Sequence, residues 1–426
     1  MPTPTPPPFP RYIWQHPAWP QLAFDAAALA PALDQARLEQ GRLLGLLGAI
    51  GLAQANEVQR ELWVQEALAT AAIEGEQLNL ESVRSSVAHR LNLADAPGSD
   101  RSVEGLVEVM QDALTNHGAA LDLDRLCRWQ SALFPGGTSG ITRIAVGRVR
   151  AHADAMQIVS GPLGREVVHY EAPPSAQVLA HMDDFLVWFE RTRPASDASA
   201  LHGIARAALV HLWFESIHPF EDGNGRLGRA LADMALAQDM HAQDAQANPA
   251  LVRVYGIARQ MIKTRAAYYD ALNQAQRLRG IAHDALVIDA TPWVLWFVQA
   301  FTRACMASQT VVRDAAEKAH FRLRAAQCQT NDRQRKVLER LLEAGHVGAG
   351  GGFLGGMSSD KYAKITNTSK ATASRDLVDL LTHGLLRVEG VGKATRYAVN
   401  VPGWEQPATQ GTAQRLPLPA NSAPKP

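Results

Sequence analysis

The residues that could do chemistry are concentrated in one short run near the middle of the chain. It extends from His218 to Arg229 and reads His-Pro-Phe-Glu-Asp-Gly-Asn-Gly-Arg-Leu-Gly-Arg. The histidine has a pKa suited to accepting a proton near neutral pH. A glycine-rich turn that opens a helix directs backbone N–H groups and the positive end of the helix dipole toward an anion. The run therefore predicts a site that holds a polyphosphate beside a base.

The residues after the base supply the anion-binding groups of this predicted site. Gly223, Asn224 and Gly225 form the anion-binding turn, because glycines let the backbone approach a ligand closely. Arg226 and Arg229 are three positions apart on the helix that follows, so both can reach the same anion.

One carboxylate completes the set. Asp222 lies beside the predicted phosphate site, which suits Mg²⁺ shared between a side chain and phosphate oxygens. Histidine-bound metal is not expected, since His211 and His218 are seven positions apart with no third ligand evident.

The run resembles the signature of Fic proteins, His-x-Phe-x-Asp/Glu-Gly-Asn-Gly-Arg-x-x-Arg, and meets it at all eight specified positions. Most characterised members transfer AMP from ATP to a hydroxyl side chain of a target protein. The resemblance implies that His218 deprotonates the target hydroxyl and that Asp222 binds Mg²⁺. It also implies that residues 223–225 hold the α- and β-phosphates, with Arg226 beside them and Arg229 at the γ-phosphate. The alternative is a chance Gly-Asn-Gly turn between two helices.

A second motif, Thr-Ala-Ala-Ile-Glu-Gly-Glu, begins at Thr70. Thr70 and Glu74 share a helix face, and Gly75 is expected to end that helix. This resembles the inhibitory motif of Fic proteins, Ser/Thr-x-x-x-Glu-Gly/Asn, in the class where it precedes the catalytic core. The resemblance implies that Glu74 pairs with Arg229 and so keeps that arginine from the γ-phosphate. The alternative is a solvated glutamate at a helix end.

Three functions remain open at this point. The first is an autoinhibited protein adenylyltransferase that modifies a Ser, Thr or Tyr hydroxyl of a target protein and of itself. The second is a DNA-bound transcriptional regulator that senses nucleotide. The third keeps the enzyme but has it remove AMP or transfer another nucleotide group, because Glu74 could also position a water. The intact His218, Asp222 and Arg229 favour an enzyme over a sensor.

The composition limits the general binding partners and the cellular compartment that we expect. The formal net charge of the 426 residues is zero, so general attraction to nucleic acid or to a membrane is not indicated. The three cysteines form no Cys-x-x-Cys pair, which fits a reducing cytosol. The first residues lack a secretory signal, and the most apolar stretch, 43–53, is too short to span a bilayer. We expect a cytoplasmic protein, and the Fic resemblance implies a homodimer.

The predicted fold is mainly α. The helical periodicity, with the resemblance, predicts an all-helical Fic core, an N-terminal helical domain and a C-terminal winged helix-turn-helix. The expected parts are a disordered Pro-rich start (1–10), an N-terminal helical domain carrying the inhibitory helix (11–100), the catalytic core (101–285), a helical connector (286–330), the winged helix-turn-helix (331–400) and a disordered tail (401–426).

The core is expected to contain one β element. β-prone pieces at 144–150, 156–160 and 167–170 precede two prolines, after which Ser175 is the predicted N-cap of a helix. Fic proteins carry a β-hairpin flap at this place, which pairs with the backbone of the target segment. A plain surface hairpin is the alternative.

The last module is predicted to be helix–helix–helix–hairpin, with helices at 331–344, 359–365 and 369–383 and strands at 384–388 and 395–399. This order resembles a winged helix-turn-helix, whose second motif helix enters the DNA major groove. A winged helix used for protein contact is the alternative. The candidate DNA-contacting residues are Lys370, Thr372, Ser374 and Arg375, together with Ser369, and on the wing Lys393 and Arg396.

Overall fold

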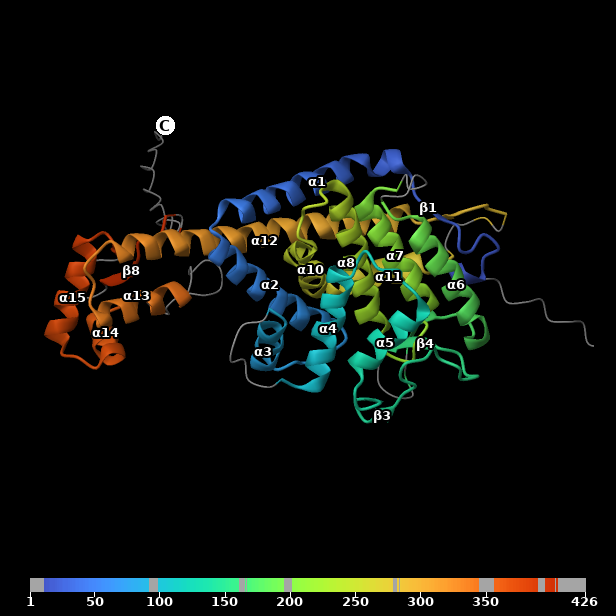
Figure 1. The fold of residues 1–426 in the computed structure, drawn as a ribbon, viewed down its shortest axis with the longest axis horizontal. Coiled ribbons are helices and arrows are strands. Elements are labelled where there is room, and N and C mark those ends of the chain that lie inside the picture. Colours follow the sequence, from blue (N-terminus) through green and yellow to red (C-terminus); the bar gives the residue numbers. More distant parts are fainter. Residues whose placement is uncertain are drawn as a thin grey trace, which may run out of the picture. The chain divides into compact units, whose positions relative to one another are not determined.

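A computed structural model describes residues 11–91, 99–160, 165, 167–194, 201–278, 282, 284–344, 356–389, 395–402 and 404. The protein is mainly α-helical, which confirms the predicted fold class (Figure 1). It divides into two compact units, residues 1–312 and 313–426. The disorder predicted for 1–10 and for most of the tail lies outside the described residues, as does Lys393. None of the described helices has the length and apolarity that crossing a bilayer requires.

After a short 3-10 helix, η1 (Ile13–Gln15), and strand β1 (Leu22–Ala23), the first unit continues with α1 (Ala26–Ala49), α2 (Leu52–Ile73) and α3 (Leu80–Arg90). Asp25 caps α1 by accepting hydrogen bonds from the N–H groups of Ala27 and Ala28. At the end of α2, Gly75 adopts φ +85°. Its N–H bonds to the carbonyl of Ala72, and the next N–H bonds to Ala71, which is the Schellman arrangement. This turn sets the direction of the chain just past the helix.

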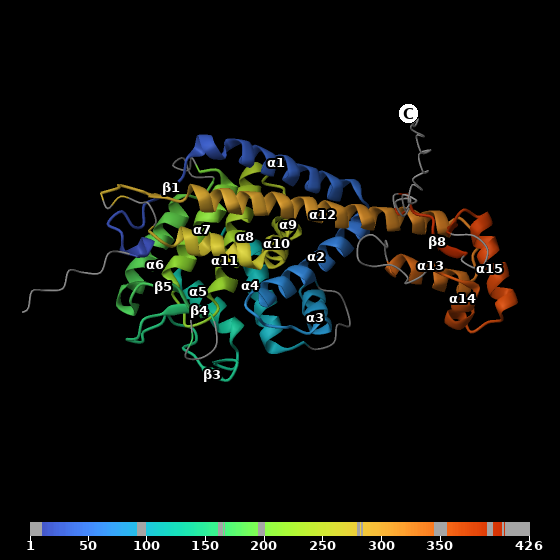
Figure 2. The same ribbon diagram turned by 180° about the vertical axis from the view of Figure 1, so that it is seen from behind.

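The centre of the unit is the pair α7 (Gly203–Ile217) and α8 (Asn224–Gln243). Every residue of α7 is buried, so this helix has no polar outer face. Figures 1 and 2 show the pair enclosed by the other helices of the unit. These are α4 (Arg101–Thr115), α5 (Leu123–Leu133), α6 (Ser175–Arg191), α9 (Val252–Tyr255), α10 (Ile257–Lys263), α11 (Arg265–Ala275) and α12 (Thr291–Ala326), of which α12 continues past residue 312.

Among its described residues, the first unit also contains three two-stranded sheets. β1 (Leu22–Ala23) pairs in parallel with β6 (Ile288–Asp289). The other two are antiparallel: β2 (Thr138–Ser139) with β3 (Thr142–Arg143), and β4 (Gln157–Ser160) with β5 (Val167–Glu171). The β4–β5 hairpin lies where the flap was predicted.

Two local predictions in this region were wrong. Residues 144–150 form no strand, because Arg150 at their end bonds to loop carbonyls instead of a neighbouring strand. Ser175 is the first residue of α6 and not its N-cap, which is Pro174. The Ser175 hydroxyl accepts a hydrogen bond from Arg150 Nη1 at 3.1 Å, so it supports the loop and not the helix end.

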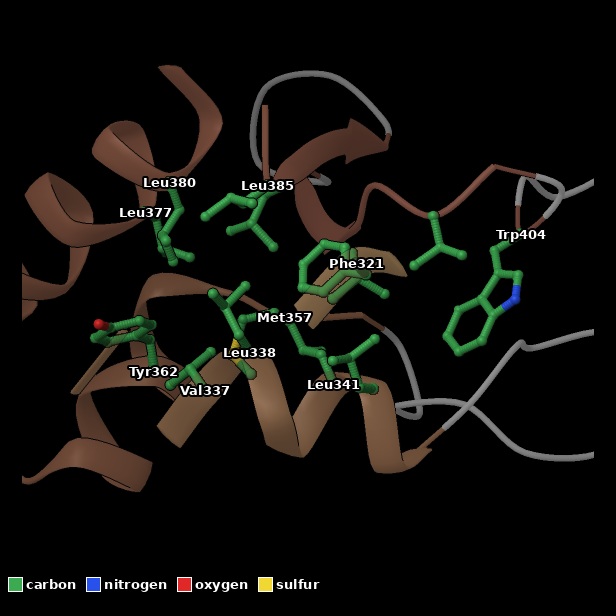
Figure 3. Packing of buried hydrophobic residues seen from close by; sticks show 14 of the residues in the cluster. Phe321, Val337, Leu338, Leu341, Met357, Tyr362, Leu377, Leu380, Leu385 and Trp404 are labelled. Carbon is green, nitrogen blue, oxygen red and sulfur yellow. The ribbon is translucent and has the colours of Figure 1, made fainter. Parts of the chain in front are cut away.

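The second unit contains α13 (Asp332–Ala344), α14 (Ser359–Thr366), α15 (Lys370–Thr382) and the antiparallel strands β7 (Leu386–Glu389) and β8 (Arg396–Val399). These elements lie within about two residues of their predicted positions. Figure 3 shows their shared core, to which α13 contributes Val337, Leu338 and Leu341. Whether the arrangement is a winged helix-turn-helix stays a prediction.

Candidate functional site

The predicted base and anion turn lie in the loop that joins α7 to α8. His218 ends α7 in the left-handed conformation at φ 51°, and Gly223 precedes α8 at φ 89°. The Asn224 side chain closes the loop between them. Its Oδ1 accepts from the Phe220 N–H at 3.0 Å, and its Nδ2 donates to the Phe220 carbonyl at 2.8 Å. Because that side chain is used internally, residue 224 can offer an incoming anion only its backbone N–H.

Arg150 holds the same loop from outside and was missed in the sequence. It is 1% exposed, and its Nε donates to the carbonyl of His218 at 2.8 Å. Its Nη2 donates to the carbonyls of Ile217 and Pro173, and its backbone N–H donates to Pro219. Burial lowers the pKa of Arg150 to about 10, so it stays charged. No sequence signal separates it from the nearby Arg148, since the role depends on tertiary contacts.

The candidate base is held in its neutral form. The side chain of His218 is 15% exposed, and burial, reinforced by the positive charge of Arg150, lowers its pKa to about 4. At neutral pH the imidazole is therefore uncharged and has one nitrogen free to accept a proton. Its Nδ1 lies 3.8 Å from Oε2 of Glu215, a buried carboxyl one turn earlier on α7.

The structure brings Thr70 and Glu74 of α2 onto Arg229 of α8. Arg229 Nε donates to the Thr70 hydroxyl at 2.6 Å, and its Nη2 donates to the Thr70 carbonyl at 2.9 Å. The same Nη2 lies 2.8 Å from Oε1 of Glu74. A Cβ at Gly225 would collide with that carboxylate oxygen. Glu74 therefore occupies the N-terminus of α8, where the helix dipole favours an anion.

A second carboxylate, Glu76, pairs with the other arginine of the signature. It lies in the segment that carries the inhibitory motif, but no role was predicted for it. Arg226 Nη1 donates to both oxygens of Glu76 at 2.9 Å. Gly75 makes this possible, because its left-handed conformation turns the chain so that Glu74 and Glu76 both face α8. Both arginines of the signature are thus paired with acidic residues from the end of α2.

Asp222 sits at the rim of the turn. Its Oδ1 accepts from the Gly223 N–H, its Oδ2 accepts from the Ser139 hydroxyl, and its side chain is 38% exposed. Within the described part of the chain, no three His, Cys, Asp or Glu side chains cluster as a metal site. Mg²⁺ at Asp222 would therefore depend on phosphate and water oxygens for its other ligands, which is its usual mode of binding.

The β4–β5 hairpin is fixed beside the base. The hydroxyl of Tyr170 on β5 donates to the carbonyl of Ser216, two residues before His218, at 2.7 Å. From the N-terminal segment, Trp14 Nε1 donates to the carbonyl of Glu171 at 2.8 Å. The first bond holds β5 near the end of α7, and the second ties β5 to the N-terminal segment.

The candidate DNA-contacting residues lie in the second unit, at the start of α15. Lys370 and Arg375 are exposed, but Lys370 Nζ pairs with Asp360 at 2.9 Å. Thr372 bonds to the N-cap Ser369, and the Ser374 hydroxyl bonds to Ser359. Arg396 lies on β8. Lys370, Thr372 and Ser374 therefore already have partners within the unit.

Two family models match segments of the first unit. Residues 120–236 match the model of the Fic/DOC family, and residues 12–93 match a domain of unknown function, DUF4172. A curated protein adenylyltransferase Fic from Nematostella vectensis is 26% identical over 221 residues, which cover 51% of this chain and 44% of that protein. Its counterpart from Drosophila ananassae is 27% identical over 218 residues, covering 49% and 40%.

The chain thus spans less than half the length of these relatives. Among solved structures, a Fic family protein from Desulfovibrio desulfuricans is similar, with 22% identity, a TM-score of 0.46 and coverage of 87% of this chain and 96% of that one.

Proposed function

Because residues 120–236 are a Fic/DOC-family domain, we propose that this chain is an autoinhibited protein adenylyltransferase. It transfers AMP from ATP to a Ser, Thr or Tyr hydroxyl of a target protein and of itself. The observation that carries the proposal is the juxtaposition of a neutral histidine with an anion site at the start of α8. That site is held shut by Glu74 on Arg229.

The chemistry assigned to the chain needs one proton acceptor and one charge clamp. A neutral His218 accepts the proton of the target hydroxyl as its oxygen attacks the α-phosphorus. The bond from that phosphorus to the bridging oxygen breaks, and pyrophosphate leaves with the electron pair. The N–H groups of residues 223–225 and the guanidinium groups of Arg226 and Arg229 stabilise the charge on the phosphates.

Asp222 is the residue that would hold Mg²⁺. Its carboxylate is partly exposed, and each oxygen keeps a lone pair beyond the bonds it accepts from Gly223 and Ser139. The ion would neutralise phosphate charge during transfer. Asp222 directly precedes Gly223, the N-cap of α8, which supports the proposal that a metal and that helix N-terminus share one polyphosphate.

Autoinhibition follows from competition for the arginines. The γ-phosphate and Glu74 need the same Arg229 donors, and a carboxylate left in place would repel the phosphate. Arg229 makes three hydrogen bonds to α2, so the block involves Thr70 as well as Glu74. Glu76 on Arg226 supplies a second block of the same kind.

Partners are proposed on separate grounds. The β4–β5 hairpin, fixed next to His218, suits strand pairing with an extended target segment. The second unit is proposed as a winged helix that binds DNA or another protein, and the chain as a homodimer. Three free cysteines are compatible with the cytoplasm as the site of action.

The test is mass spectrometry of Glu74→Gly protein incubated with Mg²⁺ and each of the four nucleoside triphosphates. We expect AMP to be added to the protein itself with ATP, well above the level in the parent. The matched control is Glu81→Gly, which removes an exposed glutamate that pairs with Arg84. His218→Ala in the Glu74→Gly background should abolish the added mass. If Glu74→Gly gains no activity over the parent, autoinhibition is rejected. Loss of AMP from a modified substrate would instead favour removal.

A further inference from the structure

A buried carboxyl beside the candidate base has no role in the mechanism above. Glu215 lies in the last turn of α7, and its side chain is 7% exposed. Its Oε2 is 3.8 Å from His218 Nδ1. Among the described residues, neither its Oε1 nor that Nδ1 has a partner of good hydrogen-bond geometry, although the backbone carbonyl of Glu215 is close enough to His218 to raise its pKa. Two unsatisfied buried polar groups this close are costly unless they serve each other.

The neighbouring helix leaves room for this carboxyl. Gly228 lies inside α8, where glycine weakens a helix relative to alanine. A Cβ at this position would lie 2.5 Å from Glu215 Oε1. The glycine therefore makes space for Glu215 on the buried side of the site. The same residue also separates Arg226 from Arg229 in the signature.

The state of a partner at Nδ1 decides whether Nε2 can act as a base. An ionised carboxylate only accepts hydrogen bonds, so it holds the imidazole proton on Nδ1 and leaves Nε2 free. A protonated carboxyl that donates to Nδ1 has the opposite effect, because the imidazole proton then resides on Nε2. The oxygen of Glu215 nearest Nδ1 can do either after a small side-chain adjustment.

We propose that Glu215 is a positioning residue for His218: its carboxylate accepts the Nδ1–H and selects the tautomer in which Nε2 takes the proton of the target hydroxyl. During transfer the proton moves from the hydroxyl to Nε2. The resulting imidazolium keeps its other proton on Nδ1, against the negative charge of Glu215. The inference rests on the proposed function, but its central observable is the tautomer of one histidine.

The groups around Glu215 link it to the inhibitory contact. Burial and the charge of Glu74 at the end of α2 raise the pKa of Glu215, and Arg229 on α8 lowers it, which leaves it at about 8. Tyr268 on α11, whose own pKa is raised by burial, also faces the carboxyl. In the closed state Glu74 therefore favours protonated Glu215 and the inactive tautomer of His218. Removing Glu74 lowers the pKa of Glu215 and favours the active tautomer.

The first test reads the tautomer directly and does not depend on activity. ¹⁵N-histidine spectra of Glu74→Gly protein, with His218→Ala to identify the signals, should show the proton of His218 on Nδ1. In Glu74→Gly/Glu215→Gln protein the signals should shift toward a mixture, because an amide both donates and accepts. A proton on Nε2 in Glu74→Gly protein at pH 9 would overturn the proposal, whatever the enzyme's activity.

The second test is kinetic. We expect Glu215→Gln in the Glu74→Gly background to lower kcat at least tenfold with the KM for ATP unchanged. The reference is the loss of about 10⁴ in kcat when the carboxylate orienting a catalytic histidine becomes an amide. The acid limb of the pH profile should disappear with it. Glu39→Gln, which alters another buried glutamate bonded to Arg42 and Gln309, is the control for burial alone.

An unchanged kcat together with an unchanged acid limb would also overturn the proposal. If the Gln variant does not fold, Glu215→Asp keeps the carboxylate and should retain an acid limb at altered pH. If Glu74→Gly protein itself shows no transfer, the proposed function fails, and the spectra still decide the role of Glu215.

Discussion

Glu74 and Glu76, the two carboxylates at the end of α2, should weaken ATP binding by different amounts of free energy. Glu74 is 30% exposed and pairs with Arg229, which is 6% exposed. Glu74→Gln keeps the shape and a hydrogen bond from Arg229 to a neutral acceptor, but removes the negative charge. A hydrogen bond to a charged group contributes about 1.5–3 kcal/mol and a neutral one about 1 kcal/mol. The difference of about 0.5–2 kcal/mol corresponds to a roughly 2- to 30-fold gain in ATP affinity.

Glu76 should contribute less, despite its two bonds to Arg226. Its side chain is 41% exposed, so solvent screens the pair. Exposed pairs contribute about 0.2–1 kcal/mol, which gives Glu76→Gln at most a roughly fivefold gain. Both residues belong to one Schellman turn. In each single variant, the remaining carboxylate therefore still holds this turn over the anion site. We therefore expect the double variant to gain at least the product of the two single gains.

The assay is calorimetric titration with Mg²⁺–ATP in a His218→Ala background, which prevents turnover. The control is Glu81→Gln, an exposed glutamate that pairs with Arg84 on the same α3 surface. Removing the charge at 81 should leave the Kd for ATP unchanged. A Kd for the Glu74→Gln/Glu76→Gln double variant within twofold of the parent would refute the competition between these carboxylates and the phosphates.

Three further predictions follow from single contacts. Between pH 4.5 and about 8 folded Glu215 keeps a proton that the unfolded chain has lost, so stability falls with rising pH by up to about 1.4 kcal/mol per unit. In chemical denaturation, the free energy of unfolding of Glu215→Gln relative to the parent should rise from pH 5 to pH 8. If the two proteins lose stability equally with pH, the prediction is contradicted. Asn224→Ala removes both bonds to Phe220 and should lower Tm by several degrees, and an unchanged Tm would exclude Asn224 as the clasp of the loop. A gel shift of duplex DNA should weaken with salt and in a Lys370/Arg375 alanine variant. No shift at low salt would favour a protein-contact role for the second unit.

The parts that the sequence predicts well are those determined by neighbours along the chain. The conformation of the α7–α8 loop is determined by consecutive residues, because a histidine, an Asn and glycines at these positions allow few backbone conformations. The elements of the second unit follow from periodicity and turn residues in the same way. In contrast, residues 144–150 were expected to be strand from their composition, and the buried guanidinium of Arg150 decided otherwise. Its partners lie at residues 173, 217, 218 and 219.

The same distinction explains why two glutamates at the site had no predicted role. Glu76 reaches Arg226 over 150 positions, and only the handedness of Gly75 turns it inward. Glu215 is one turn from the base, yet its importance depends on a missing side chain at Gly228 on another helix. In both cases a glycine of a motif allows a contact by a carboxylate outside the specified positions of that motif: Gly75 for Glu76, and Gly228 for Glu215. A Gly228→Ala variant should therefore act on His218 through Glu215, with a change in the pH profile of transfer at constant affinity for ATP. If it weakens ATP binding instead, the glycine serves the phosphates and not the carboxyl.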